Sequence, residues 1–434
     1  MDNGAQSLSN SAVGGGLLSR KEQKTLALTA VGGALEYFDF IVAVFFTKIL
    51  AAVFFPPDTP SWLAQLSVFC IFAAGYLIRP VGGLVFAHFG DKLGRKRIFA
   101  LSLFLMVLPT FVMGLLPSYY QLGIASPLLL LVCRILQGLS VGGEVPGAFI
   151  FCSEHVKQDR VGISCGFIMG GICSGILLGA LSATSLNTAL TPAELASWGW
   201  RIPFIAGGFA GFIAVYLRRY LQESPVFTAL HAHQSQEGRL PIATVLKEHR
   251  SATLAGMLGT WVFSGVFVVF FLYLPTYLQT QWKVPGKTVF AANSWSILLL
   301  IVGCIVTGAF VDRLGWAKTF ALGAIGTAVT LIIFFVNLTS GQPSALDWYM
   351  VTGFFIGMIT VVPYLLVTAF PAPVRFTGFS LSFNTAYAIF GGTAPVLMAA
   401  LVGGKGLVNA PIIYILALCL LALVIAVTWK KPKF

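Results

Sequence analysis

Acidic and basic side chains lie within long apolar segments of the first half of the chain, where they could transfer protons or bind a charged ligand. The clearest examples are Glu36, Asp39, Arg79 and Arg134. In a lipid bilayer each such charge costs about 2.5–3.5 kcal/mol on insertion scales, so each one requires a functional or structural reason. The apolar segments of the second half contain almost no charge. This asymmetry indicates that the first half handles ions.

The two carboxylates are candidates for proton coupling. Glu36 and Asp39 are three residues apart, which places them on one face of a helix. A low-dielectric cavity favours the neutral form of a carboxylate, whereas a nearby arginine favours the charged form. A carboxylate that moves between two such environments can therefore load and release a proton. The alternative is a permanent ion pair, for example Asp39 with Arg79, that only holds two helices together.

The two arginines differ in their depth within their segments. Arg79 lies near the middle of its apolar segment, and Arg134 lies nearer the outer end of its own. A guanidinium keeps its charge and offers a fork of donors that matches a carboxylate. We therefore assign Arg79 to the binding site of an anionic substrate, and Arg134 to the proton-coupling group with Glu36 and Asp39. In the alternative, Arg134 caps backbone carbonyls of the first helix or pairs with an acid.

The composition requires lipid as the main solvent of these segments. Of 434 residues, 57% are hydrophobic and 10% are charged, whereas soluble domains contain about 25% charged residues. This excludes a soluble enzyme. The seven cysteines all lie in apolar segments without a CxxC or Cys/His cluster, so we expect no disulfide framework, no metal site and no cofactor.

Twelve apolar runs predict an all-α integral membrane protein, because each is long enough for a spanning helix of about 20 residues. They lie near 26–54, 63–89, 98–116, 127–154, 161–187, 202–220, 253–281, 288–311, 319–337, 347–370, 376–402 and 410–428. We predict a disordered tail at 1–25, six-helix bundles at 26–220 and 253–428, a central loop at 221–252 and a short tail at 429–434.

The positive charges predict the orientation. Most of the 27 lysines and arginines fall in the tails and in the connections on the same side as the tails. Only Arg201, Lys283, Lys287 and Lys405 fall in the connections on the other side. By the positive-inside rule both termini are cytoplasmic. The net charge of +12 is thereby explained without a nucleic-acid partner.

An internal repeat relates the two halves. Residues 90–101 (GDKLGRKRIFAL) follow the second apolar run, and residues 311–322 (VDRLGWAKTFAL) follow the eighth. Asp, Leu, Gly, Phe, Ala and Leu match in register. A parallel duplication of six-helix halves, related by a pseudo-two-fold axis, is the simplest explanation.

These motifs carry a family resemblance over the whole chain. Residues 91–96 (DKLGRK) resemble the signature loop of the major facilitator superfamily, and residues 134–143 (RILQGLSVGG) resemble its fourth-helix motif. Finer features are similar to the metabolite–proton symporters, a branch that contains bacterial carriers for citrate, α-ketoglutarate, shikimate and proline or betaine. These features are EYFDF at 36–40, LIRP at 77–80, WGWRIPF at 198–204 and ESP at 223–225.

The resemblance implies a proton-coupled symporter of the bacterial inner membrane that works by alternating access, and we expect it to act as a monomer. It further implies a cytoplasmic gate formed by Asp91, Arg95 and Glu154. Because Trp316-Ala317 replaces the basic pair in the second copy of the loop motif, we expect this latch mainly on the N-terminal half.

The expected substrate is a small organic carboxylate. Beside Arg79, the neutral candidates for contacting it are Tyr37, Tyr273, Asn384 and Tyr387. Two alternatives remain open for the cargo: a zwitterion such as proline or betaine, and a polycarboxylate siderophore. A membrane enzyme or receptor is disfavoured, because the loops contain no nucleophile–base pair, phosphate loop or metal cluster.

Overall fold

The computed structural model describes residues 20–83, 95–154, 156–218 and 241–429 of the chain. The first half contains α1 (Arg20–Phe45), α2 (Thr47–Phe54), α3 (Ser61–Leu77), α5 (Arg95–Leu115), α6 (Tyr119–Leu122), α7 (Ala125–Val141), α8 (Glu144–Glu154), α9 (Val161–Ala189), α10 (Pro192–Glu194) and α11 (Arg201–Arg218). We call this part the N-half. Asp91 lies outside the described residues.

The second half, here the C-half, contains α13 (Pro241–Glu248), α14 (Arg250–Phe267), α15 (Leu274–Thr280), α16 (Gly286–Leu314), α17 (Trp316–Thr339), α18 (Ala345–Ile356), α19 (Val361–Thr368), α20 (Ala372–Ala386), α21 (Gly392–Ala399) and α22 (Ala410–Thr428). Short π-helical segments η3 (Val268–Tyr273) and η5 (Tyr387–Gly391) join α14 to α15 and α20 to α21. The central stretch predicted as a loop therefore contains a helix, α13, and α14 begins at Arg250.

The expected membrane-spanning segments are confirmed as helices. Within the described residues, nine helices are long and apolar enough to cross a membrane, and the bent pair of α1 and α2 supplies a tenth. Two shorter apolar helices, Phe104–Leu115 and Arg201–Ile213, occupy the remaining two predicted segments. The all-α membrane fold predicted from the sequence is thus present.

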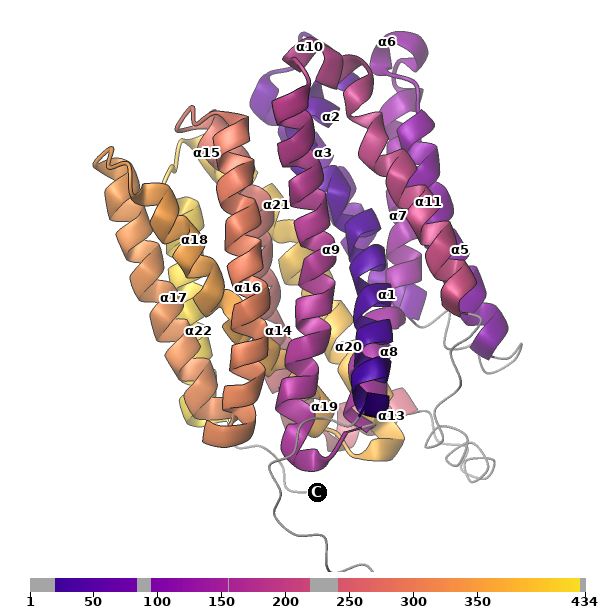
Figure 1. The fold of residues 1–434 in the computed structure, drawn as a ribbon, viewed down its shortest axis with the longest axis vertical. Coiled ribbons are helices and arrows are strands. Elements are labelled where there is room, and N and C mark those ends of the chain that lie inside the picture. The colour runs from indigo at the N-terminus through magenta and orange to yellow at the C-terminus, as the bar shows by residue number, and fades with distance from the viewer. Residues whose placement is uncertain (1–19, 84–94, 155, 219–240, 430–434) are drawn as a thin grey trace, which may run out of the picture.

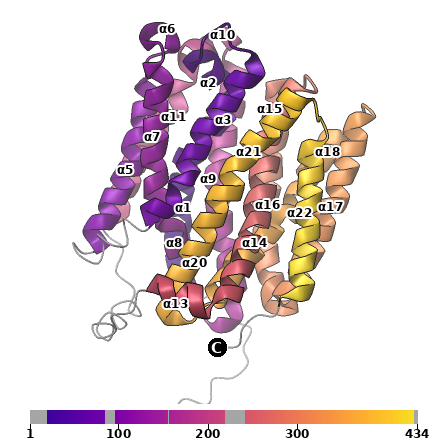
Figure 2. The ribbon, with the colours of Figure 1, turned by 180° about the vertical axis from the view of Figure 1, so that it is seen from behind.

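The two halves stand side by side as bundles of roughly parallel helices (Figure 1). On one side of their interface α9 packs against α16, and on the other side α3 packs against α21 (Figure 2). We call the end of the molecule that contains α13 the α13 end, and the end that contains α6 and α10 the α6 end (Figure 1). The interface between the halves therefore runs from one end of the molecule to the other.

Several helices are interrupted near the interface. The pair α1 and α2 bends by 63° at Phe46. Segment η3 precedes Pro275, which lacks the N–H group that would bond to the carbonyl of Phe271 in a regular helix. The Asn293 Nδ2 atom donates to this carbonyl at 3.3 Å instead. The side chain thus satisfies the backbone group that the proline leaves free.

Candidate functional site

A guanidinium surrounded by aromatic rings lies between the two halves. The Cζ atom of Arg79 is 4.9 Å from the ring centroid of Tyr387, 5.4 Å from that of Tyr76 and 5.9 Å from that of Phe383. Tyr37 also lies beside the guanidinium. We call these five residues the Arg79 cage. Tyr37, Tyr76 and Arg79 belong to the N-half, and Phe383 and Tyr387 to the C-half, so the cage exists only while the halves are together.

The guanidinium of Arg79 has spare hydrogen-bonding capacity. Arg79 is 1% exposed. Its Nε atom and one terminal nitrogen, Nη2, are buried without a hydrogen-bond partner among the described residues. The faces of the rings stabilise the charge through cation–π contacts. Since the carboxyl oxygens of Asp39 likewise have no hydrogen-bond partner in the described part of the chain, the Asp39–Arg79 pair considered above is absent there.

Asn384 joins the two halves beside the cage. Its Nδ2 atom donates to the carbonyl of Gly142 at 2.6 Å and to the Ser380 hydroxyl at 3.1 Å. Gly142 lies in the break between α7 and α8, and its backbone packs directly on the backbone of Arg79. The packing of the two halves thus brings together four of the predicted substrate-binding residues: Tyr37, Arg79, Asn384 and Tyr387.

Tyr273, the remaining substrate candidate, lies closer to the α6 end. Its ring contacts that of Phe69, with centroids 5.7 Å apart. Phe69 precedes Tyr76 by seven residues on α3, a rise of about 10.5 Å along the helix. Tyr273 therefore contributes to a separate contact between the halves, about two helical turns from the cage.

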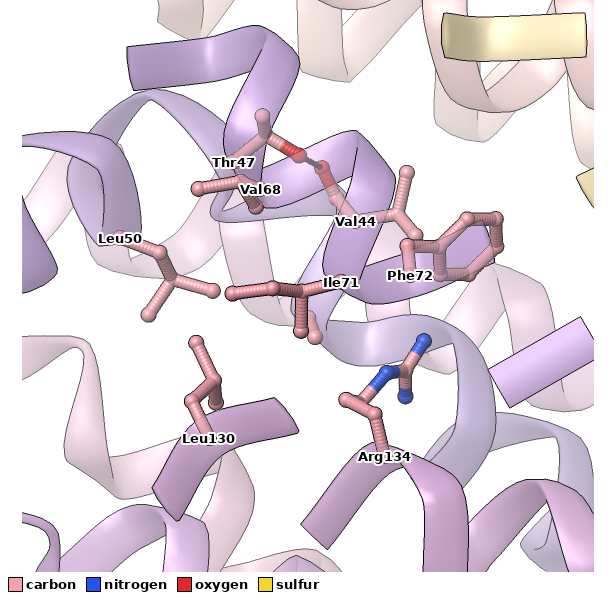
Figure 3. Close-up of a pocket in the computed structure, with 9 residues that line it drawn as sticks. Val44, Thr47, Leu50, Val68, Ile71, Phe72, Leu130 and Arg134 are labelled. Atoms are coloured by element: carbon pink, nitrogen blue, oxygen red, sulfur yellow. Dashed lines mark hydrogen bonds between the residues drawn. The ribbon is translucent and has the colours of Figure 1, made fainter. Parts of the chain in front are cut away.

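Arg134 is held by the backbone of α1. Its Nη1 atom donates to the carbonyl of Phe40 at 2.7 Å and to the Gln137 side chain at 2.9 Å. The guanidinium also lies 4.8 Å from the ring of Phe40 and 5.0 Å from that of Phe72. It borders a cavity of about 10 Å³ beneath the bend between α1 and α2 (Figure 3). This geometry matches the capping role considered as an alternative for Arg134.

Asp39 points into the N-half, towards α11. A Cβ atom at Gly207 would lie 2.5 Å from the Asp39 Oδ1 atom, and one at Gly211 would lie 3.0 Å from Oδ2. The two glycines therefore make the space that the carboxyl group occupies. Asp39 is 1% exposed, and no hydrogen bond to either oxygen is present among the described residues. Such a site strongly penalises a negative charge, so a change in the charge of Asp39 requires movement of α1 or its neighbours.

Two further acids of the N-half, Glu36 and Glu144, are also buried. Glu36 lies on α1 one turn before Phe40, and Glu144 begins α8 directly after the break that contains Gly142. Both side chains make interactions within the protein. Glu36 thus shares α1 with Asp39 and Tyr37, the helix that links the carboxylates to the cage.

Two contacts between the halves lie at the α13 end. The Glu154 carboxylate pairs with Arg375 of α20 at 3.3 Å. Asp312 of α16 accepts hydrogen bonds from the backbone N–H groups of Gly162 at 2.7 Å and Ile163 at 2.8 Å. These N–H groups belong to the first turn of α9, where a carboxylate also interacts favourably with the helix dipole. Together these bonds tie the halves at this end.

These contacts change the expectation for the gate. Glu154, predicted as a gate residue, lies at a contact between the halves, but its partner Arg375 was missed, and so was the contact made by Asp312 in the second copy of the loop motif. One signal was available in the sequence, since Asp312 aligns in register with Asp91 in the internal repeat. Arg95 begins α5, but its side chain lies outside the described part of the structure, as does Asp91. The predicted N-half latch therefore stays a prediction.

The halves also touch each other at the α6 end. Besides the contact of Phe69 with Tyr273, the hydroxyl groups of Thr184 on α9 and Ser294 on α16 are 3.3 Å apart. The halves thus touch at both ends and around the cage between them.

The profile described as Major Facilitator Superfamily matches residues 29–395. A "putative proline/betaine transporter" of Staphylococcus aureus (strain COL) is 33% identical over 409 residues, which cover 94% of this chain and 88% of the relative. The "proline/betaine transporter" of Escherichia coli (strain K12) is 30% identical over 433 residues, which cover 95% of this chain and 84% of the relative.

Solved structures agree on the fold. The proton:xylose symporter XylE bound to 6-bromo-6-deoxy-D-glucose superposes with a TM-score of 0.74 at 17% identity, over 93% of this chain and 94% of that one. A partially occluded, inward-open form of the xylose transporter from E. coli gives a TM-score of 0.71 at 16% identity, over 93% and 97% of the two chains. The chain therefore belongs to the Major Facilitator Superfamily, and it is a multi-pass membrane transporter rather than an enzyme.

Proposed function

We propose that this transporter is a proton symporter that imports a small zwitterionic carboxylate across the bacterial plasma membrane. The proposal narrows the organic carboxylate expected from the sequence to the alternative class, the zwitterions. The names of the bacterial relatives support this choice, because proline and betaine are both zwitterionic carboxylates. The transporter acts as a monomer, with both termini and the α13 end in the cytoplasm.

The Arg79 cage is the observation that carries the proposal. A zwitterion needs a donor fork for its carboxylate and a surface for its ammonium group. The free N–H groups of Arg79 supply the fork. The rings of Tyr76, Phe383 and Tyr387, which now face the guanidinium, supply the surface, because aromatic faces also bind ligand ammonium groups. A substrate that binds both the Arg79 fork and the aromatic rings replaces part of the contact between Arg79 and these rings.

Asp39 carries the coupled proton in this account, and Glu36 assists it. The carboxyl group of Asp39 is enclosed by Gly207 and Gly211 of α11. The carbonyl of the next residue, Phe40, is held from α7 by a hydrogen bond from Arg134. When Asp39 loses its proton, the buried charge is costly where it lies and is attracted towards the positive charge of Arg134. Deprotonation therefore favours a shift of α1, the helix that also contributes Tyr37 to the cage.

Alternating access follows from the two sets of contacts between the halves. Opening towards the cytoplasm requires Asp312 to release α9 and Glu154 to release Arg375. Opening towards the outside requires separation of Phe69 from Tyr273 and of Thr184 from Ser294. Because both sets lie on the same pair of rigid bundles, rocking about the cage breaks one set while the other remains.

Uptake into proteoliposomes tests this function. Purified protein is reconstituted, and labelled L-proline and glycine betaine are offered with an alkaline interior. We expect accumulation of at least one of them above its external concentration, and loss of this accumulation when a protonophore is added. Accumulation that persists with the protonophore would refute proton coupling. Labelled di- and tricarboxylates are offered in the same assay. If they alone accumulate, the proposal of a zwitterionic substrate is refuted.

A further inference from the structure

The amide of Asn384 is an unexplained polar group next to the Arg79 cage. Asn384 is 1% exposed, yet its Oδ1 atom is buried without a hydrogen-bond partner among the described residues. Buried amide oxygens normally accept at least one hydrogen bond, and leaving one unmade is unfavourable. The atom therefore needs an explanation that the contact with Gly142 does not provide.

The orientation of the amide follows from its neighbours. A backbone carbonyl can only accept hydrogen bonds, so the atom of Asn384 that lies 2.6 Å from the Gly142 oxygen must be the nitrogen, Nδ2. The second contact of Nδ2 is with the Ser380 hydroxyl. Both donor hydrogens of the amide are thus used, and Oδ1 is an acceptor with free capacity.

This acceptor lies close to the groups proposed to bind the substrate. Asn384 and Tyr387 are three residues apart at the junction of α20 and η5, so they share one face of the helix. On the other side of the interface, Gly142 packs directly on the backbone of Arg79. The Asn384 amide therefore lies beside the cage, at a contact between the two halves.

We propose that the Asn384 Oδ1 atom accepts a hydrogen bond from the ammonium group of the substrate, so that the transporter prefers zwitterions that retain an N–H over fully methylated ones. This inference rests on the proposed function and adds a specificity determinant to it. A quaternary ammonium, such as that of glycine betaine or N,N-dimethylproline, has no N–H and would leave the buried Oδ1 atom unpaired. A site built to pair with an N–H group rejects a substrate that lacks it more strongly than an apolar pocket could.

A series of proline derivatives tests the proposal, because each step replaces one N–H by a methyl group. L-Proline has two N–H bonds on its ammonium nitrogen, N-methylproline has one, and N,N-dimethylproline has none. Each compound competes with labelled L-proline for exchange in proteoliposomes, and the inhibition constant is measured. For the wild type we expect the main loss of affinity, about tenfold or more, when the last N–H is removed.

Two variants distinguish a direct role of Asn384 as a hydrogen-bond acceptor from a purely structural role. Asn384→Leu removes Oδ1 and the bond to Gly142, so the affinities for all three compounds fall. The ratio of the affinity for N-methylproline to the affinity for N,N-dimethylproline decreases to within threefold, which is the effect expected from size alone. Ser380→Ala, the matched control one turn earlier, leaves Oδ1 in place and keeps the wild-type ratio. A purely structural role of Asn384 predicts that the ratio stays unchanged in Asn384→Leu.

The outcomes distinguish this inference from the proposed function. Equal wild-type affinity for the three compounds, or an unchanged ratio in Asn384→Leu, would overturn the inference while leaving zwitterion transport intact. If the wild type exchanges no proline and binds none of the three compounds, the proposed function fails and the inference fails with it. The wild-type ratio alone is decisive if Asn384→Leu does not fold.

Discussion

Two buried arginines in the N-half illustrate how surroundings, and not residue type, decide the role of a side chain. Arg134 is fixed by bonds of 2.7 and 2.9 Å to the Phe40 carbonyl and to Gln137. Arg79 faces aromatic rings and keeps buried N–H groups free in the described structure. A guanidinium bound to the backbone stabilises a helix position, whereas one held by ring faces can exchange those contacts for a ligand. This difference supports Arg79 as the binding group.

Replacement of Arg79 by lysine tests this assignment. A lysine keeps the positive charge but loses the planar fork that pairs with a carboxylate. We expect Arg79→Lys to weaken zwitterion binding by about 1–3 kcal/mol, or roughly 5- to 150-fold in the dissociation constant. The measurement is the ligand concentration that half-saturates thermal stabilisation of the purified protein.

Arg201→Lys is the matched control for this experiment. Arg201 bonds to the carbonyls of Gly114 and Leu116 at the α6 end, away from the cage. We expect that variant to bind the zwitterion with wild-type affinity. If Arg79→Lys also kept wild-type affinity, Arg79 would have to be removed from the binding site.

At the scale of helices, the contact between α9 and α16 shows how the degenerate second copy of the loop motif still joins the two halves. Trp316 and Ala317 replace the basic pair of the first copy, yet Asp312 keeps its position and caps α9. The cap is possible because Gly162 and Gly308 let the two helices approach closely. A Cβ atom at Gly162 would lie 2.5 Å from the Gly308 carbonyl oxygen.

Loss of this cap should favour opening at the α13 end. Asp312→Asn removes the charge and one of the two accepted hydrogen bonds, which costs the closed state about 1–2 kcal/mol. Cys165, one turn along α9 and buried, is a native reporter of opening. We expect faster alkylation of Cys165 by a small maleimide in Asp312→Asn, measured by mass spectrometry.

Two controls accompany the Asp312→Asn measurement: a second buried cysteine and a second variant. Cys419 on α22 is buried away from the gate and should react at the wild-type rate. Glu154→Gln should change Cys165 labelling less than Asp312→Asn, because the partly exposed Glu154–Arg375 pair contributes only about 0–1 kcal/mol. Equal labelling of Cys165 in wild type and Asp312→Asn would show that the cap does not hold the gate.

The contact between α1 and α11 makes a second prediction at this scale. Gly207→Ala places a Cβ atom 2.5 Å from the Asp39 carboxyl oxygen and 2.8 Å from the ring of Phe38. Such overpacking costs about 1–3 kcal/mol, so we expect a lower melting temperature in detergent. In Gly147→Ala, where the new Cβ atom would be 3.8 Å from Phe376, the melting temperature should stay close to wild type. Equal stability of the two variants would mean that α11 does not fix the position of Asp39.

At the scale of the whole molecule, the spanning helices were predictable because a bilayer imposes their length and apolar character. The sequence could not predict which helices of one half meet those of the other. Arg79 was therefore identified as a buried guanidinium, while its neighbours Tyr76 and Phe383 were missed. Likewise, Glu36 and Asp39 were expected on one helix face, but only the packing of α11 shows that Asp39 points into the N-half. Pairings between distant segments depend on the register of whole helices, which local patterns do not specify.

The proposed orientation of the molecule in the membrane can be tested with cysteines introduced at its two ends. Lys157 is exposed at the α13 end, and Lys405 is exposed at the α6 end. If the positive-inside rule holds, Lys405→Cys reacts with a membrane-impermeant maleimide in intact cells, whereas Lys157→Cys reacts only in inverted vesicles. The reverse pattern would require the opposite orientation.

The central claim is that protonation and deprotonation of Asp39 on α1 drive the rocking of the two halves about the Arg79 cage. The most direct test compares two assays of Asp39→Asn in proteoliposomes: accumulation of labelled zwitterion driven by a pH gradient, and exchange of labelled for unlabelled zwitterion at equal pH. The asparagine imitates the protonated acid and cannot release a proton. We therefore predict that accumulation is lost while exchange continues within about tenfold of the wild-type rate. Accumulation by Asp39→Asn at the wild-type level would contradict the account.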